Sequence, residues 1–204
     1  MSYAVKEIFY TMQGEGARAG NAAVFVRFSG CNLWSGREQD RATASCRFCD
    51  TDFIGGERMA ATEIARKAAS FWPGAYDGRF VVLTGGEPLL QVDAALIQEL
   101  KRERFEVAIE TNGTLPGVTG IDWMCVSPKA GADLVHGTAE ELKLVFPQPG
   151  LMPDKLTQFQ TYHRWLSPMA GPDLAENTRA AIAYCLMHPE WKLTMQHHKV
   201  WGIA

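Results

Sequence analysis

Short apolar runs alternate along the chain with longer segments in which apolar residues recur every three or four positions. The short runs are rich in β-branched and aromatic residues and are apolar on both faces or nearly so, as buried parallel strands are. They predict strands over residues 22–28, 79–84, 106–111, 122–127, 141–146 and 155–160. The longer segments predict helices over residues 62–72, 92–105 and 172–188.

The predicted helices have recognisable ends. Thr62 is a suitable N-cap for the first helix, which ends before Pro73. The second has apolar residues at helical spacing with its charges on the opposite face. The third opens at Pro172 and Asp173 and stops before Pro189.

The strand–helix–strand order predicts an α/β fold with a largely parallel sheet. Six strands and about three helices are too few for a closed eightfold barrel. We therefore expect a partial, TIM-like barrel or a curved open sheet, formed by one domain over residues 1–204. Ligand sites in such folds gather at the C-terminal ends of the strands.

Composition and charge narrow the classes of function. The chain is 47% hydrophobic and 21% charged, with a formal net charge of −3, which argues against a nucleic-acid binder. No apolar run approaches the roughly 20 residues of a membrane span, and the N-terminus lacks the features of a secretory signal. An odd number of cysteines, five, with one C-x-x-C, favours metal or redox chemistry in a cytoplasmic protein.

Four unusual stretches fall at the C-terminal ends of four of the predicted strands. They are Cys31 after 22–28, TGGEP at 84–88, ETNG at 110–113 and SPK at 127–129. Each alone has an ordinary explanation; TNG, for example, can be a simple Asn-Gly turn. Because the C-terminal ends of parallel strands meet at one rim, the four together predict a single site.

Three cysteines, Cys31, Cys46 and Cys49, are separated by fourteen and two residues. They could be three ligands of a zinc site that Cys125, Cys185 or a histidine completes. Cys125 and Cys185 lie in apolar contexts, however, and are more typical of buried structural thiols. Three thiolates could instead hold a [4Fe–4S] cluster with one iron open, which S-adenosylmethionine can occupy.

The cysteine triplet, Phe48 before its last member and GGEP together resemble the radical S-adenosylmethionine superfamily. YTMQGEG, FVRFSGCNLW, CRFCDT, VLTGGEPLLQ, ETNGT, SPK and HHKVWGI resemble, in combination, the 7-carboxy-7-deazaguanine synthase family. The resemblance runs from residue 3 to the C-terminus. The long first gap between the cysteines marks a subgroup that carries an insertion there.

The resemblance implies a (β6/α3) partial barrel and a lyase that converts 6-carboxy-5,6,7,8-tetrahydropterin to 7-carboxy-7-deazaguanine. It implies a [4Fe–4S] cluster on Cys31, Cys46 and Cys49, S-adenosylmethionine and Mg²⁺. Residues expected at S-adenosylmethionine are Phe48, Asp50, Gly86, Glu87, Glu110, Asn112, Ser127 and Lys129, with a weaker expectation for SPMAG at 167–171.

The resemblance also implies a substrate pocket. Thr51 is the expected Mg²⁺ ligand, and Asp52 is a chemically reasonable alternative. Arg27 suits the substrate carboxylate, or else is a charge at a strand end. The C-terminal segment should fold over the pocket, unless residues 195–199 are only a last strand. Expected at the substrate are Met12, Gln13, Gly14, Glu15, Arg27, Thr84 and Ala204.

Two other functions stay open at this point. A glycyl-radical activating enzyme would use the same cysteine chemistry, and a zinc-stabilised binding module would use the cysteines without the other motifs. For the leading interpretation we expect a flavodoxin- or ferredoxin-type reductant, a homodimer, and neither nucleic acid nor membrane as partner. Trp34 is expected to be exposed, and the insertion at 32–45 could shield the cluster, bind the reductant or support the dimer.

Overall fold

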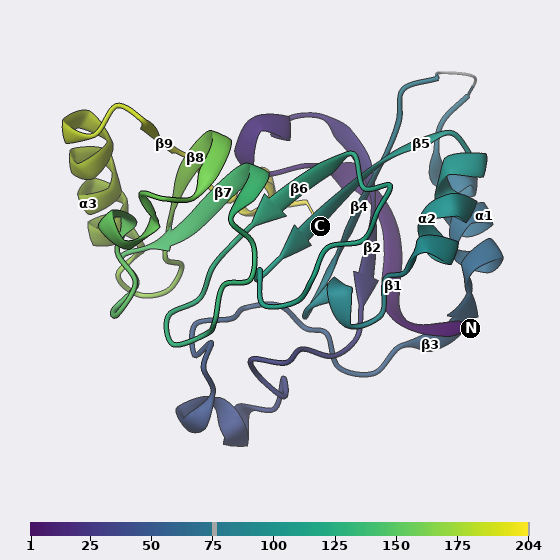
Figure 1. Ribbon diagram of the computed structural model, residues 1–204, viewed down its shortest axis with the longest axis horizontal. Helices are drawn as coiled ribbons and strands as arrows, with labels where there is room; N and C mark the ends of the chain where they lie inside the picture. The colour runs from purple at the N-terminus through teal and green to yellow at the C-terminus, as the bar shows by residue number, and fades with distance from the viewer. Residues whose placement is uncertain (75–76, 204) are drawn as a thin grey trace.

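One curved sheet of nine strands runs through the whole molecule in a computed structural model that describes residues 1–74 and 77–203 (Figure 1). Its strands are β1 Ser2–Met12, β2 Ala22–Phe28, β3 Glu57–Ala60, β4 Arg79–Gly85, β5 Phe105–Thr111, β6 Trp123–Val126, β7 Thr138–Phe146, β8 Gln160–Pro168 and β9 Trp191–Leu193. The α-helices are α1 Ala61–Phe71, α2 Ala94–Arg102, α3 Leu174–Met187 and α4 His197–Trp201. Short 3₁₀ helices are η1 Gly16–Arg18, η2 Glu38–Thr43, η3 Pro88–Leu90 and η4 Pro153–Leu156.

The sheet is mostly parallel. The strand order is β3-β1-β2-β4-β5-β6-β7-β8-β9, and every pair from β2 to β9 is parallel. Near one edge, β1 runs antiparallel to both of its neighbours, β2 and β3. The sheet is open rather than closed, so the expected partial barrel is confirmed. Within the described residues, no helix is both long and apolar enough to cross a membrane.

Five of the six predicted strands are confirmed as β2, β4, β5, β6 and β7. The sixth was wrong: residues 155–160 cover the end of η4, and β8 begins only at Gln160. The outer face of β8 carries Arg164, whose guanidinium donates to the backbone carbonyls of Leu156 and Phe159. Because this strand carries a partly buried arginine, it lacks the continuous apolar run by which a buried strand is predicted from the sequence. The alternative strand at 195–199 was also wrong, because α4 begins at His197.

β1 is a long strand whose apolar pattern gave no prediction. Tyr3, Val5 and Ile8 are its buried residues, and the pairing with β2 shifts register between Val5 and Glu7. Such a bulge adds one residue to a strand and moves the following side chains to the other face. The alternation that would mark a strand is therefore interrupted in the sequence.

The three longer helices form where they were predicted, with adjusted ends. α1 starts at Ala61 rather than after Thr62, and the Glu63 carboxylate accepts the Ala60 N–H at 2.6 Å. α2 begins after Asp93, whose carboxylate accepts the Leu96 N–H at 3.0 Å. In both helices a carboxylate satisfies a backbone donor that the first turn would leave unpaired.

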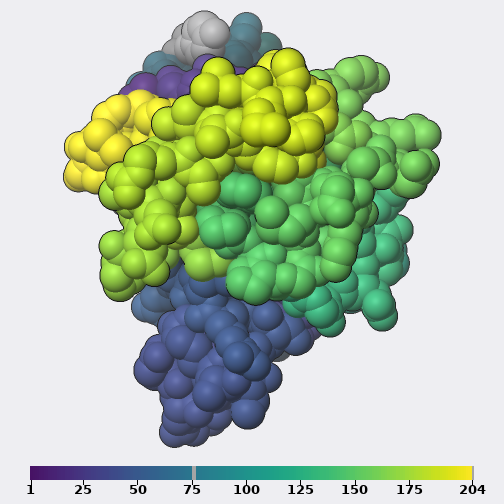
Figure 2. Space-filling model, turned by 90° about the vertical axis from the view of Figure 1, so that its left-hand side faces the viewer, coloured from purple at the N-terminus to yellow at the C-terminus, as the bar shows by residue number. Residues whose placement is uncertain are grey.

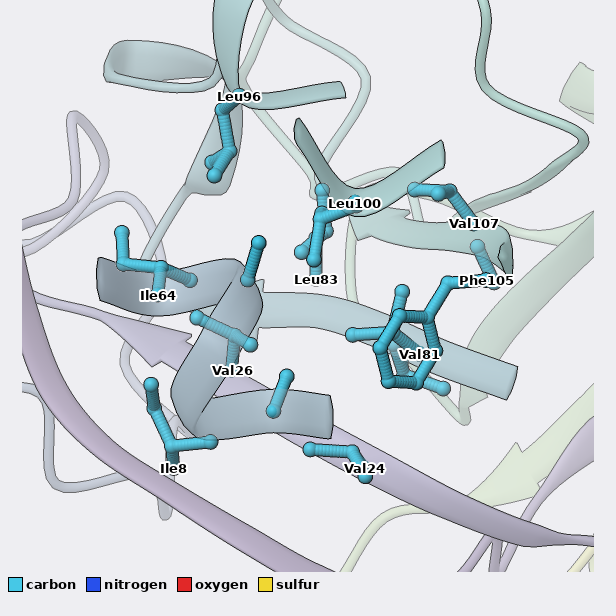
Figure 3. Packing of buried hydrophobic residues seen from close by; sticks show 14 of the residues in the cluster. Ile8, Val24, Val26, Ile64, Val81, Leu83, Leu96, Leu100, Phe105 and Val107 are labelled. Atoms are coloured by element: carbon cyan, nitrogen blue, oxygen red, sulfur yellow. The ribbon is translucent and has the colours of Figure 1, made fainter. Parts of the chain in front are cut away.

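The helices cover the convex face of the sheet. Ile64 of α1 and Leu96 and Leu100 of α2 pack over Val26 and Leu83, as Figure 3 shows. Full burial of each such side chain contributes about 2 kcal/mol. A second apolar cluster joins β6–β9 to α3, which lies at the opposite end of the sheet in Figure 1.

The concave face is filled at its N-terminal end by η1. The Arg18 guanidinium stacks 4.4 Å from the Trp123 ring, and the Ala17 N–H donates to the Glu141 carboxylate at 2.8 Å. The Gly16 N–H donates to Thr194 Oγ1 at 2.8 Å. η1 thus forms a floor, and the polar loops at the C-terminal ends of the strands remain above it.

Candidate active site

Two neighbouring cavities lie at the C-terminal ends of the strands. The first, of about 200 Å³, contains the three clustered cysteines and is called the cysteine cavity. The second, of about 280 Å³, lies against β1 and β2 around Arg27 and is called the Arg27 cavity. Residues that line both are Glu15, Asp50, Thr51, Thr84, Glu110 and Gln196. The single site predicted from four strand ends is therefore a pair of cavities with a common wall.

The three cysteines line the same cavity from two directions. Cys31 follows β2, and burial raises the pKa of its thiol. Cys46 and Cys49 share a hydrogen bond that lowers the pKa of Cys49 to about 6 and raises that of Cys46, where burial adds to the rise. The hydrogen bond between them therefore favours the thiolate at Cys49 and the neutral thiol at Cys46.

Three thiols around one cavity fit a cluster in which each cysteine binds its own iron. In the described part of the chain, no three or more His, Cys, Asp or Glu side chains are grouped to hold a single metal ion. Cys125 is buried in β6 and Cys185 packs against the second apolar cluster, so neither lines the cysteine cavity.

Both glycines of GGEP are required by close packing. A Cβ on Gly86 would lie 2.1 Å from the carbonyl oxygen of Gly30, beside Cys31. Gly85 has a φ of +138°, and a Cβ there would lie 2.2 Å from the Phe28 carbonyl oxygen. The loop after β4 can therefore approach the loop that carries Cys31 only without side chains.

Glu87 has a different place from the one expected. Its carboxylate is fully buried and accepts from Thr111 Oγ1 at 2.8 Å, from the Asn112 N–H at 2.7 Å and from the Leu89 N–H at 3.0 Å. Burial raises its pKa, and these donors oppose the rise. It does not line the cysteine cavity. Glu87 instead joins the loop after β4 to the loop after β5.

The other residues expected at S-adenosylmethionine gather in the cysteine cavity. They are Phe48, Asp50, Gly86, Glu110, Asn112, Ser127 and Lys129. The SPMAG segment contributes Ser167, Pro168 and Ala170.

The polar ends of several of these side chains already have partners. The Lys129 ammonium donates to Ser127 Oγ at 2.8 Å, and burial lowers its pKa. The Asn112 side chain donates to Asn32 Oδ1 at 3.0 Å and accepts from Thr114 Oγ1 at 2.7 Å, which ties the segment after Cys31 to the loop after β5.

Trp34, in the insertion, was expected to be exposed, and that expectation was wrong. Its side chain is 8% exposed and packs edge-on against Phe53 at 5.6 Å. The indole N–H donates to the Arg37 carbonyl at 3.2 Å. Trp34 is therefore the buried apolar residue against which the polar insertion packs.

Arg27 projects into the second cavity from β2 and is held from one side. Its Nε donates to the Glu7 carboxylate at 2.7 Å, and its guanidinium lies 5.7 Å from the Phe9 ring. No partner for its two terminal nitrogens is found among the described residues. The other expected substrate residues in the described part line the same cavity, namely Met12, Gln13, Gly14, Glu15 and Thr84.

A buried charge network, which sequence reasoning missed, underlies both cavities. The Lys143 ammonium lies 2.5 Å from Glu15 and 2.6 Å from Glu110, and Gln13 donates to Glu110 at 2.9 Å. Burial alone would lower the pKa of Lys143, but the two carboxylates raise it well above its usual range. The same lysine holds the pKa of Glu110 below its usual value against burial. A charged residue inside the apolar run ELKLVF was the available signal.

The C-terminal segment folds over the Arg27 cavity. His197 donates through its backbone N–H to the Gly14 carbonyl at 3.1 Å, and Lys199 forms an ion pair with Asp50 beside Cys49. Gln196, His198 and Lys199 line the cavity, and these too were missed. Ala204 lies outside the described residues, so its expected substrate contact is not placed.

Thr51, the expected Mg²⁺ ligand, lies on the common wall of the two cavities. Asp52 also lines the Arg27 cavity, but its carboxylate pairs with Lys6 at 2.8 Å and is mostly exposed. The position of Thr51 is therefore compatible with a metal between two ligands, and Asp52 is already paired.

Comparisons with known proteins agree with this geometry. Residues 39–143 match the family model described as the radical SAM superfamily. A 7-carboxy-7-deazaguanine synthase of Bradyrhizobium diazoefficiens is 56% identical, and one of Caulobacter vibrioides is 54% identical; both matches cover 100% of each chain. The crystal structure of QueE from Escherichia coli superposes with a TM-score of 0.72 at 26% identity, over 96% of this chain and 94% of that one.

Proposed function

Since the chain belongs to the 7-carboxy-7-deazaguanine synthases of the radical S-adenosylmethionine superfamily, we propose a division of that reaction between its two cavities. The protein is a carbon–nitrogen lyase that converts 6-carboxy-5,6,7,8-tetrahydropterin to 7-carboxy-7-deazaguanine in queuosine and deazapurine biosynthesis. The ring contracts and ammonia is lost. One observation carries the division: a cavity with three thiols shares a wall with a cavity built around an arginine.

The cysteine cavity holds the cofactors in this proposal. Cys31, Cys46 and Cys49 bind the [4Fe–4S] cluster, and S-adenosylmethionine occupies the remaining space. When bound, this pair supplies an adenosyl radical that removes a hydrogen atom from the substrate. Gly86 and the side chains of Phe48, Asp50, Glu110, Asn112, Ser127 and Lys129 bind and orient S-adenosylmethionine. Glu87 supports them from behind, because its carboxylate holds the loop after β5 in place.

The Arg27 cavity holds the substrate. The two terminal nitrogens of Arg27 form a fork for the substrate carboxylate, while Glu7 fixes the opposite side of the guanidinium. The pterin edge presents N–H donors beside a carbonyl, which suit the carboxylate of Glu15 and the amide of Gln13. Met12, Gly14 and Thr84 complete the wall, and Ala204 is proposed as a contact from the family resemblance.

Mg²⁺ is proposed at Thr51. A single hydroxyl ligand suffices where water and substrate oxygens complete the coordination, because Mg²⁺ retains several waters. The common wall lets a metal at Thr51 contact a substrate oxygen without leaving the cysteine loop. Mg²⁺ would then hold the substrate in register with the radical.

A second copy of the chain is the proposed partner for α3. This helix has one buried residue, Ala181, whereas Leu186 is 79% exposed and Met187 is 78% exposed. α3 lies on the face turned toward the reader in Figure 2. Two copies can cover the same apolar patch on each other about a twofold axis. Leu186→Glu with Met187→Glu should therefore convert a dimer to a monomer in light scattering.

The remaining expectations are proposed on chemical grounds. A flavodoxin- or ferredoxin-type protein supplies the electron, because a cluster of this kind must be reduced before it acts. The cytoplasm supplies both such a reductant and S-adenosylmethionine. Residues 1–204 are proposed as one domain, since both apolar clusters lie on the same continuous sheet.

The test is a reaction with anaerobically reconstituted protein. Reduced enzyme with S-adenosylmethionine, 6-carboxytetrahydropterin and Mg²⁺ should form 7-carboxy-7-deazaguanine, detected by mass. Formation of 5′-deoxyadenosine without that product would retain the radical chemistry and reject the substrate. Neither compound from a preparation with a verified cluster would reject the function.

A further inference from the structure

The insertion between the first two cysteines forms a compact lobe with its own small core. Residues 32–45 contain η2 and project from the body of the molecule, seen as the blue lobe at the lower end of Figure 2. Inside the lobe, Trp34 packs on Phe53, which lies beyond Cys49 and is 2% exposed. The contact between Trp34 and Phe53 therefore joins the lobe to the segment that follows the C-x-x-C motif.

Arg41, in η2, is the centre of this lobe. Its guanidinium lies 4.1 Å from the centre of the Trp34 ring. Its Nε donates to both oxygens of the Glu38 carboxylate, at 2.9 and 2.7 Å. Its Nη1 donates to the backbone carbonyls of Arg47 at 2.8 Å and Cys49 at 3.0 Å. The ring below and the carboxylate beside it fix the guanidinium in one orientation.

We propose that Arg41 is a positioning residue for the iron–sulfur cluster, which acts by holding the C-x-x-C backbone through the carbonyls of Arg47 and Cys49. The inference rests on the proposed binding of the cluster by the three cysteines. It assigns the insertion a role: the lobe is a clamp on the cysteine loop, built from Trp34, Glu38 and Arg41.

The cysteine loop needs such a clamp because it has no regular structure of its own. Residues 46–53 contain neither helix nor strand, so no ladder of backbone hydrogen bonds fixes the two thiols. Ordering each such residue costs about 1–2 kcal/mol in backbone entropy. Arg41 satisfies two carbonyls of this loop with one rigid group, and the thiols of Cys46 and Cys49 are thereby held at a set spacing.

The experiment compares Arg41→Ala with Arg37→Ala after anaerobic reconstitution. Arg37 lies in the same lobe and is exposed; no contact of its guanidinium is found among the described residues, and its backbone carbonyl still accepts from Trp34 in the variant. We expect Arg41→Ala to lose iron to a chelator about tenfold faster than the wild type, a typical cost of removing an outer partner of a metal ligand. Its reduced cluster should also show an altered EPR signal with S-adenosylmethionine. Arg37→Ala should match the wild type in both.

Two further measurements separate positioning from folding. Arg41→Lys keeps the charge but lacks the planar guanidinium, which bonds Glu38 through Nε while Nη1 donates to the two carbonyls, so it should lose iron nearly as fast as Arg41→Ala. The cluster-free variants should melt with the wild type, because the lobe lies outside both apolar clusters. Equal chelator rates and EPR signals for Arg41→Ala and the wild type would overturn this inference alone. A wild-type protein that binds no cluster would overturn the proposed cysteine ligands, and this inference with them.

Discussion

The two cavities differ in how their walls are made. Around the cysteine cavity, several polar side chains are already paired within the protein: Glu87 with two loops, Asn112 with Asn32, and Lys129 with Ser127. Around the Arg27 cavity, side chains from β1, β2 and the C-terminal segment bring unlike charges to one space. In the proposed division, the first cavity is shaped by fixed loops and holds the cofactors, and the second is lined by charged side chains and holds the substrate.

The same difference appears in how the charges are held. Lys143 lies beneath both cavities and neutralises Glu15 and Glu110, which line each of them. Arg27 is held by one carboxylate, that of Glu7, which bonds its Nε. A buried cation with two carboxylates is structural, whereas a cation with one partner retains donors for a ligand. The predictions below test this distinction in order of expected effect.

The largest effect is expected from a cysteine of the first cavity. Cys49→Ser removes the thiol with the lowered pKa and should abolish product formation, because the cluster then lacks one of its ligands. Iron and sulfide content after reconstitution measures this directly. Cys185→Ala is the matched control, since Cys185 packs against the second apolar cluster, and it should retain a full cluster. A full cluster in Cys49→Ser would remove Cys49 from the ligands.

Lys143→Met should affect stability most among the changes that leave the cysteines intact. It leaves the largely buried carboxylates of Glu15 and Glu110 without their cation, which should lower the free energy of unfolding by about 3 kcal/mol. Denaturant unfolding measures the change. Adding Glu110→Gln should recover part of the loss, whereas exposed Lys67→Met should change nothing. A fully stable Lys143→Met would show that the network does not support the wall.

Arg27→Ala should weaken binding of the substrate and leave binding of S-adenosylmethionine nearly unchanged. Loss of a charge-assisted pair costs about 1.5–3 kcal/mol, so KM for the substrate should rise roughly 10- to 100-fold. Binding of S-adenosylmethionine, followed by calorimetry, should stay within a factor of about two, because Arg27 does not line the cysteine cavity. Equal losses for the two ligands would make Arg27 structural and would remove the contrast between the cavities.

Lys199→Ala should have the smallest effect. The ion pair with Asp50 is about half exposed on both sides, and exposed pairs contribute about 0–1 kcal/mol. Substrate affinity should therefore fall by at most about fivefold, with cluster content unchanged. Substrate titration in parallel with iron analysis gives both values. A loss as large as that of Arg27→Ala would place Lys199 in direct contact with the substrate.

The sequence predicted the parts of this molecule whose physical cause is local. The central strands β2, β4, β5, β6 and β7 are apolar on both faces, and their loops carry the motifs of the cysteine cavity. β1 escaped prediction because its bulge breaks the alternation, and β8 because the charged side chain of Arg164 interrupts its apolar pattern. The bulge exists only in the pairing of β1 with β2, and Arg164 is held by the loop before β8, so neither cause is visible in the local sequence.

The charge network escaped for a related reason. Glu15, Glu110 and Lys143 lie far apart in the chain and meet only when β5 and β7 come close to the segment after β1. Glu15 and Glu110 were expected as ligand contacts, but the cation that joins them was not. The structural use of Glu87 was missed too, because a motif gives the type of residue and not the direction of its side chain.

The common wall has a thermodynamic consequence. Because Glu15, Asp50, Thr51, Thr84, Glu110 and Gln196 belong to both cavities, the occupant of one sets the positions available to the other. Any change in affinity that S-adenosylmethionine causes for the pterin must be matched by an equal change that the pterin causes for S-adenosylmethionine. Where that coupling is favourable, bound substrate tightens the binding of S-adenosylmethionine by the same factor as bound S-adenosylmethionine tightens the binding of substrate.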